Sequence, residues 1–204
     1  MDTTDTATTN HPTDSTDHTH DAGAAPGPTG RTSDDPADGD PATALVVRAP
    51  RTSDGAAMWR LARDTGSLDL NSSYAYLLLA DHFSATCRIA FLGDRPVGFL
   101  SAYRLPADPS RLFVWQVAVD EQARGRRVAA RMLDAVVDET PGVTSLATTV
   151  TEDNTASRRL FARFAARRDA TLRETTGYEA ADFPDGHEAE PLLLVEGLPG
   201  PRDR

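Results

Sequence analysis

The chain contains no lysine, so arginine supplies all 21 basic side chains among its 204 residues. It has one cysteine, Cys87, which excludes an internal disulfide and is expected to be a small buried apolar residue of a strand. No apolar run approaches the roughly 20 residues of a membrane-spanning helix. The beginning of the chain, Met1-Asp2, shows neither the basic start nor the apolar centre of a secretory signal. These absences predict a cytoplasmic protein that does not contact membranes.

Residues 1–43 lack Leu, Ile, Val, Phe, Trp and Tyr, the large side chains that build most cores. They hold nine Asp and one Arg, a net charge of −8, whereas residues 44–204 hold 22 acidic and 20 basic side chains, a net of −2. A segment of the first kind cannot bury enough apolar surface to offset the entropy lost on ordering. We therefore expect a disordered acidic tail over 1–43 and one folded domain over 44–198. Because that domain is nearly neutral, no broad basic surface for nucleic acid is predicted.

Apolar periodicity and turn signals predict an alternation of strands and helices after the tail. The expected strands cover residues 44–48, 87–92, 96–103, 111–119, 143–150 and 192–195, and the expected helices cover about 53–63, 74–83, 128–140 and 154–168. Thr52 or Ser53 would cap the first helix and Gly66 would end it, while Gly93-Asp94 would form a hairpin turn. This order predicts an α/β (α+β) fold, with a central mixed sheet flanked by helices in one domain.

The segment 112–133 reads as an apolar strand, a short Gly/Arg turn and an amphipathic helix. Such a turn leaves backbone N–H groups unpaired at a helix N-terminus, where the helix dipole also favours an anion. Arg124, Arg126 and Arg127 add three cations at the same place. The pattern favours a phosphate site, and the alternative is an ordinary connection with a basic rim.

The loop 124–129, Arg-Gly-Arg-Arg-Val-Ala, resembles the pyrophosphate loop of the GNAT superfamily of acyl-CoA N-acetyltransferases. That family shows Arg/Gln-x-x-Gly-x-Gly/Ala after a strand that ends in Val-x-Val, and the strand here ends at 117–119, Val-Ala-Val. Arg124 and Ala129 match the pattern, whereas Arg127 replaces the middle glycine. Since Arg lacks the conformational freedom of Gly, we expect the loop to pass Arg127 at negative φ. The fold expected from this resemblance is the GNAT fold.

A second element at residues 150–161 is similar to the Asn-x-x-Ala/Ser-x-x-Leu-Tyr pattern of the same family. Asn154 and Ser157 match, and Phe161 stands where the family has a Tyr that often protonates the leaving thiolate. Taken alone, Asn154 is better read as a plain helix N-cap, whereas together with the upstream loop it is expected to cap the helix and to hold the cofactor. The resemblance implies acetyl-CoA as co-substrate, held by Val117, Val119, Arg124, Gly125, Arg126, Arg127, Val128, Ala129, Asn154, Ser157 and Phe161.

Three further segments, at residues 69–76, 113–117 and 184–190, are similar to the diaminobutyrate acetyltransferases of ectoine biosynthesis, a family within the superfamily. The resemblance covers about residues 45–195. It implies acetylation of the N4 amine of L-2,4-diaminobutyrate, a small molecule with two ammonium groups and one carboxylate. A site for this molecule needs acidic side chains for the cations and a group that takes a proton from the reacting amine.

By this resemblance Asp69 and Glu190 hold the ammonium groups, Tyr74 and Trp115 shape the site, and His187 helps to remove the proton. Asp69, His187 and Glu190 are therefore the expected catalytic residues. Each residue has an alternative role. Asp69 would form an Asx turn, Trp115 would belong to the core, and His187 and Glu190 would be solvated.

The resemblance also implies a homodimer, no metal, and an oxyanion donor at the backbone N–H near Val117, because amine attack on a thioester needs only positioning, deprotonation and a polarised carbonyl. Two other functions remain open. One is acetylation of another amine, such as a polyamine or an aminoglycoside. The other is an inactive acyl-CoA-binding module, which Arg127 and Phe161 motivate.

Overall fold

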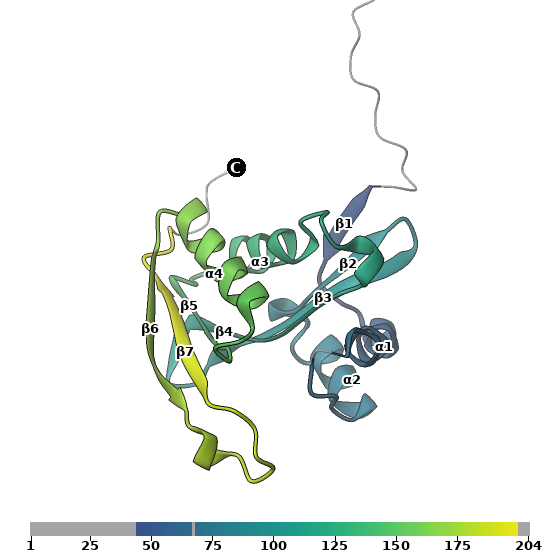
Figure 1. Cartoon of the computed structure of the whole chain (residues 1–204). Coiled ribbons are helices and arrows are strands. Elements are labelled where there is room, and N and C mark those ends of the chain that lie inside the picture. The colour runs from purple at the N-terminus through teal and green to yellow at the C-terminus, as the bar shows by residue number, and fades with distance from the viewer. Residues whose placement is uncertain (1–43, 67, 200–204) are drawn as a thin grey trace, which may run out of the picture. The chain divides into compact units, whose positions relative to one another are not determined.

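A computed structural model describes residues 44–66 and 68–199, which form a mixed sheet with the strand order β1-β2-β3-β4-β5-β7-β6. Helices α1 and α2 pack on one face of this sheet, and α3 and α4 pack on the other (Figure 1). Among the strands of these residues, only β4 and β5 pair in parallel. The α/β class predicted from the sequence is confirmed. The expected disorder of 1–43 lies outside the described residues, and none of the helices within them is long and apolar enough to span a bilayer.

The strands are β1 Leu45–Arg48, β2 Arg88–Leu92, β3 Arg95–Leu105, β4 Asp108–Val119, β5 Ser145–Thr149, β6 Thr171–Tyr178 and β7 Glu190–Glu196. The helices are α1 Gly55–Thr65, α2 Ser73–Asp81, α3 Val128–Asp138 and α4 Thr155–Arg167, and short 3₁₀ turns cover Thr52–Asp54, Ser84–Thr86, Glu121–Ala123 and Ala180–Asp182. The hairpin turn at residues 93–94 and the end of α1 at Gly66 are confirmed, the latter with a left-handed C-cap at φ 60°.

Two local predictions were wrong. The strand β6 was not expected, because an edge strand pairs on one side only and its half-exposed residues, Thr-Leu-Arg-Glu-Thr-Thr-Gly-Tyr, show no apolar run. The start of α1 also differs, since neither Thr52 nor Ser53 caps it. These residues form a 3₁₀ turn instead, in which the Asp54 carboxylate accepts a hydrogen bond from the Arg51 backbone N–H (2.7 Å).

The larger part of the core lies between the sheet and helices α3 and α4. The apolar face predicted for α3 is buried, and its residues are Val128, Met132, Leu133, Val136 and Val137. Burial of each such side chain contributes about 1.5–3 kcal/mol, so this face fixes the helix on the sheet. A smaller cluster packs α1 and α2 on the opposite face.

Strand β4 is irregular at the point that matters for function. It pairs with β5 only through residues 111–113, and its later residues pair with β3 alone. A bulge also interrupts its pairing with β3, because Ser101 faces Gln116 while Ala102 faces Val114, which leaves Trp115 without a partner on β3. The sheet therefore opens between the ends of β4 and β5.

Candidate active site

Two cavities meet where β4 and β5 separate. The first has a volume of about 1320 Å³ and lies along the end of β4, the start of α3 and one side of α4. The second, of about 850 Å³, lies beside it toward the β6–β7 connection. Both are lined by Leu68, Val117, Thr151, Asn154 and Ser157. We call the first the cofactor groove, the second the acceptor cavity, and their five shared residues the junction.

The cofactor groove contains the Gly/Arg loop, whose conformation differs from the expectation. Arg127 does not pass at negative φ but is left-handed at φ 59°, as Gly125 is at φ 81°. An L-residue in this conformation costs about 1–2 kcal/mol, so the turn into α3 needs a glycine-like backbone that Arg127 adopts with strain. Arg127 is also the N-cap of α3 and makes no side-chain capping bond. The first N–H groups of α3 are therefore not capped by Arg127, which suits an anion.

The opposite wall of the groove begins at the N-terminus of α4. The Oδ1 of Asn154 accepts a hydrogen bond from the Ser157 backbone N–H (3.0 Å), which confirms the N-cap, and both residues also line the junction. Phe161 is placed differently from its expected role in cofactor binding. Only 2 % of it is exposed, within the core, and it lines neither cavity.

Arginines dominate the charge of the groove. Its charged lining residues are Arg124, Arg127, Asp153, Arg159, Arg163 and Arg167. Arg124 and Arg167 pair with carboxylates, whereas Arg127, Arg159 and Arg163 make no ion pair with any carboxylate in the described part of the chain. Arg159 and Arg163 were missed from the sequence, although their spacing of four residues places them on one face of α4.

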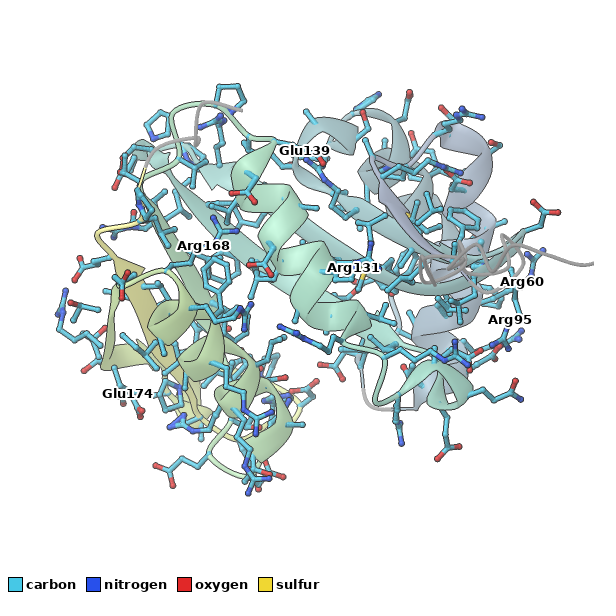
Figure 2. All side chains as sticks on the ribbon, turned by 90° about the horizontal axis from the view of Figure 1, so that it is seen from above. Arg60, Arg95, Arg131, Glu139, Arg168 and Glu174 are labelled. Atoms are coloured by element: carbon cyan, nitrogen blue, oxygen red, sulfur yellow. The ribbon has the colours of Figure 1, made fainter. Side chains whose placement is uncertain are left out.

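The walls of the groove are tied together at its far end. Arg168, labelled in Figure 2, follows α4 and is only 8 % exposed. Its guanidinium pairs with Asp138 (2.6 Å) and Asp134 (3.0 Å) of α3. These charge-assisted hydrogen bonds hold α3 and α4 together and so fix the width of the groove.

The acceptor cavity brings together three predicted site residues from two distant segments, 69–76 and 184–190. The Nε2 of His187 lies 3.7 Å from Oδ2 of Asp69 and 3.9 Å from Oε1 of Glu190. Asp69 belongs to the loop between α1 and α2, His187 to the β6–β7 connection, and Glu190 to the first position of β7. The Thr149 hydroxyl donates a hydrogen bond to Oε2 of Glu190 (2.5 Å), which orients that carboxylate.

Charges around His187 favour its protonated form. Its Nδ1 lies 2.8 Å from the backbone carbonyl of Glu188, and this hydrogen bond, followed by the charges of Glu190, Asp69 and Asp185, raises the pKa of His187 against the opposing effect of burial. With the proton of the neutral ring on Nδ1, the lone pair of Nε2 faces the cavity. Nε2 is therefore the atom positioned to take a proton from a bound amine.

These positions decide two of the alternative roles and the expected place of Tyr74. Trp115 is 45 % exposed and lines the acceptor cavity, so it is not a core residue. The Asp69 carboxylate makes no hydrogen bond with its own loop among the described residues, so the Asx turn is not formed. Tyr74 is 66 % exposed and lines neither cavity, which disagrees with its expected place in the site.

Several residues of the acceptor cavity were not found from the sequence. Its further polar and aromatic lining residues are Asn71, Tyr103, Phe113, Gln116, Thr148, Thr149, Tyr178, Phe183 and Asp185. The Phe183 ring lies 4.7 Å from that of His187 and supports it on one side. Asn71, Phe113, Gln116 and Asp185 lie within the segments 69–76, 113–117 and 184–190, but no role was assigned to them there, and the other residues reach the cavity only through the pairing of distant strands.

The arrangement suits transfer of a group between two bound molecules. The groove offers arginines and a helix N-terminus to a phosphorylated carrier, and the acceptor cavity offers carboxylates and an imidazole to a cationic amine. The junction is the place where reacting atoms of the two would meet.

Comparison with known proteins agrees with this geometry. The model of the acetyltransferase (GNAT) family matches residues 56–166. The L-2,4-diaminobutyric acid acetyltransferase of Streptomyces coelicolor is 50 % identical over 159 residues, which cover 76 % of this chain and 94 % of that protein. The corresponding enzyme of Bordetella parapertussis is 45 % identical over 82 % of this chain and 93 % of its own.

A solved structure of diaminobutyrate acetyltransferase EctA from Paenibacillus lautus, in complex with L-2,4-diaminobutyric acid and coenzyme A, is 46 % identical. It superimposes with a TM-score of 0.72 and covers 79 % of this chain and 98 % of that one. The structure of Ard1 from Thermoplasma volcanium, at 18 % identity and a TM-score of 0.62, shares the fold. The chain therefore belongs to the acetyltransferase (GNAT) family.

Proposed function

We propose that the protein transfers the acetyl group of acetyl-CoA to the N4 amine of L-2,4-diaminobutyrate, the acetylation step of ectoine biosynthesis. The observation that carries the proposal is the convergence of Asp69, His187 and Glu190 beside the junction. Relatives named L-2,4-diaminobutyric acid acetyltransferase, and the solved relative in complex with this substrate and coenzyme A, support the proposal.

The two carboxylates suit an acceptor with two ammonium groups. Glu190 is held by Thr149 at the end of β5, and Asp69 approaches the same His187 ring nitrogen from the loop between α1 and α2. An ammonium group of the substrate near these two carboxylates would form the charge pairs that a protonated Nε2 otherwise makes. The exposed face of Trp115 adds an aromatic surface that attracts a cation.

Acetyl-CoA supplies a thioester whose carbonyl carbon accepts the amine. His187 Nε2 takes the proton of the reacting ammonium group, which frees the nitrogen lone pair for attack. The backbone N–H near Val117, a junction residue, is the donor that we assign to the negative charge developing on the carbonyl oxygen. Phe161 has no proton to give, so the C–S bond breaks without an acid from this position, and the remaining proton of the former amine passes to the departing thiolate or to solvent.

The groove would hold the phosphates of the carrier. The uncapped start of α3 suits the pyrophosphate, and Arg127, Arg159 and Arg163 supply cations without internal partners in the described structure. Asn154 and Ser157 at the junction lie where the pantetheine arm would reach the acceptor.

Release of free thiol from acetyl-CoA, measured across a panel of amines, tests the proposal. We expect L-2,4-diaminobutyrate to give the highest kcat/KM, with spermidine and an aminoglycoside far below it. A polyamine as the best substrate would assign a different acceptor. Binding of coenzyme A without thiol release from any amine would instead favour an inactive binding module.

We also infer a cytoplasmic homodimer. Exposed apolar side chains in the loop before α2 and on α2 itself support self-association, and they are Leu70 at 46 %, Tyr74 at 66 % and Leu77 at 40 % exposure. Light scattering on the purified protein tests the assembly. A monomer at micromolar concentration would contradict it.

A further inference from the structure

We propose that Gln116 is a positioning residue that holds the loop of Asp69 against β4 and thereby sets the affinity for the acceptor amine. The inference rests on the proposed acetylation at Asp69 and adds a residue that touches neither reacting atom. Gln116 is a buried amide whose two ends bind two different elements.

The hydrogen bonds of Gln116 define its role. Its Nε2 donates to the backbone carbonyl of Asp69 (3.0 Å), and its Oε1 accepts from the Tyr76 hydroxyl (3.1 Å). Gln116 is 5 % exposed and Tyr76 on α2 is fully buried. Since the Asp69 carbonyl can only accept, it fixes the Nε2 end of the amide toward the loop, which leaves Oε1 to accept from the Tyr76 hydroxyl.

The bulge in β4 explains why Gln116 points toward the loop. The extra residue Trp115 interrupts the pairing with β3, and the Gln116 backbone N–H donates to the Ser101 hydroxyl (3.1 Å). Trp115 and Gln116 consequently both line the acceptor cavity although they are neighbours in a strand, where side chains ordinarily alternate between faces.

The Asp69 loop has little else to hold it. The Asp69 side chain is 91 % exposed, and its described side-chain contact is the pair with His187 at 3.7 Å. Within residues 68–72, the hydrogen bond from Gln116 is the only one that the described sheet makes to the loop. Leu68 adds an apolar contact with the smaller core cluster. Loss of the Gln116 bond would therefore let the Asp69 carboxylate move away from His187.

The test is a double-mutant cycle between Gln116→Met and Asp69→Asn. Methionine keeps the length of the side chain and removes both hydrogen bonds. With acetyl-CoA saturating, we expect Gln116→Met to raise the KM for diaminobutyrate about five- to tenfold, as for loss of about one hydrogen bond. Calorimetric affinity for coenzyme A should stay within about twofold of the unmodified protein, by the same scale.

In the Asp69→Asn background, Gln116→Met should raise the KM for diaminobutyrate by less than about a further twofold. A residue that acts through the Asp69 carboxylate has no effect on binding once that carboxylate is absent. Equal increases in both backgrounds would overturn the inference, as would a parallel loss of affinity for coenzyme A. Asp69→Asn without effect on the amine KM would contradict the proposed acceptor site itself, so the two failures are distinguishable.

Two further variants separate positioning from general loss of stability. Tyr76→Phe keeps the Gln116 bond to the loop and should raise the amine KM less than Gln116→Met does. Thr140→Val removes a buried hydroxyl that donates to the Val136 carbonyl at the far end of α3. It should lower the melting temperature and leave the amine KM unchanged. A similar KM increase in Thr140→Val would reduce the role of Gln116 to that of any stabilising buried polar group.

Discussion

The Nε2 of His187 lies 3.7 Å from Oδ2 of Asp69, a residue of the loop between α1 and α2, and both residues line the acceptor cavity. The two residues belong to opposite ends of the domain, and Glu190 approaches the same nitrogen at 3.9 Å. A protonated imidazole and a substrate ammonium therefore compete for the same two carboxylates.

Neutralising the carboxylates should weaken binding of the amine by different amounts. A charge-assisted hydrogen bond contributes about 1.5–3 kcal/mol, or roughly ten- to hundredfold in affinity. Glu190, which is 25 % exposed and held by Thr149, should show the upper part of this range in Glu190→Gln. Asp69 is 91 % exposed, so solvent screening should place Asp69→Asn near the lower end.

Steady-state titration of each variant with both substrates provides the measurement. Affinity for coenzyme A serves as the internal control and should not change. An unchanged amine KM in both variants would remove these carboxylates from the acceptor site.

The activity should depend on pH through His187. Only the neutral ring can take a proton, so kcat/KM for the amine should rise as the pH passes the raised pKa of His187. Removing a neighbouring charge in Glu190→Gln lowers that pKa and should move this acidic limb to lower pH. His187 would be excluded as the base if the acidic limb of the pH profile did not move in Glu190→Gln and were still present in His187→Gln.

The raised pKa of His187 also affects the stability of the fold. Because folding raises the pKa above the ordinary 6.5, the protonated ring stabilises the fold below that value, and this contribution is lost as the pH rises through the raised pKa. Melting curves of the unmodified protein and of His187→Gln should therefore differ more at pH 5 than at pH 9.

The Gly/Arg loop should respond to substitution according to its backbone. Arg127→Gly relieves a left-handed residue at φ 59° and should raise the free energy of unfolding by up to about 1 kcal/mol, with a modest loss of affinity for coenzyme A through the lost cation. Gly125→Val should lower both the free energy of unfolding and the affinity for coenzyme A, since a β-branched residue is strained at φ 81°.

The cause at Gly125 is strain in the backbone, because a Cβ there would meet no described atom within 4 Å. Calorimetry with coenzyme A and thermal melting measure the two effects. Equal affinity in Gly125→Val and the unmodified protein would contradict the placement of the phosphates on this loop.

Gly177 should be essential to the position of Glu190. A Cβ on Gly177 would lie 2.1 Å from the Glu190 carbonyl oxygen and 2.7 Å from the Leu192 backbone N, so β6 and β7 would have to move apart. Gly177→Ala should therefore lower the free energy of unfolding by about 1–3 kcal/mol and raise the amine KM.

The matched control is Gly142→Ala, which is also strained, at φ 75°, but has open space around it and lies away from the cavity. It should cost stability without a change in the amine KM. An amine KM that is the same in Gly177→Ala and Gly142→Ala would show that Gly177 does not determine the position of the acceptor site.

The sequence was sufficient for features that local chemistry determines. The Asn154 cap, the apolar face of α3 and the turn at residues 93–94 each follow from a few neighbouring residues, and each was predicted. The resemblance placed Phe161 in cofactor binding, whereas the structure buries it in the core away from both cavities.

Other features depend on the pairing of distant strands. The bulge that turns Gln116 toward Asp69 exists only in the register of β3 with β4, and the edge strand β6 is defined by its partner β7 rather than by its own side chains. The left-handed Arg127 was predicted with the wrong sign of φ, because the geometry of the turn outweighs the preference of the residue.

The meeting of two cavities at a shared junction has a consequence for the order in which substrates bind and products leave. Each cavity has its own lining beyond the five shared residues, so the carrier and the amine can be bound at once. The cysteine of the chain, Cys87, lines neither cavity, and burial raises the pKa of its thiol to about 11, so it is no candidate to receive the acetyl group covalently. Initial-rate plots against both substrates should therefore intersect, as in a ternary complex, and should not run parallel as in a ping-pong reaction.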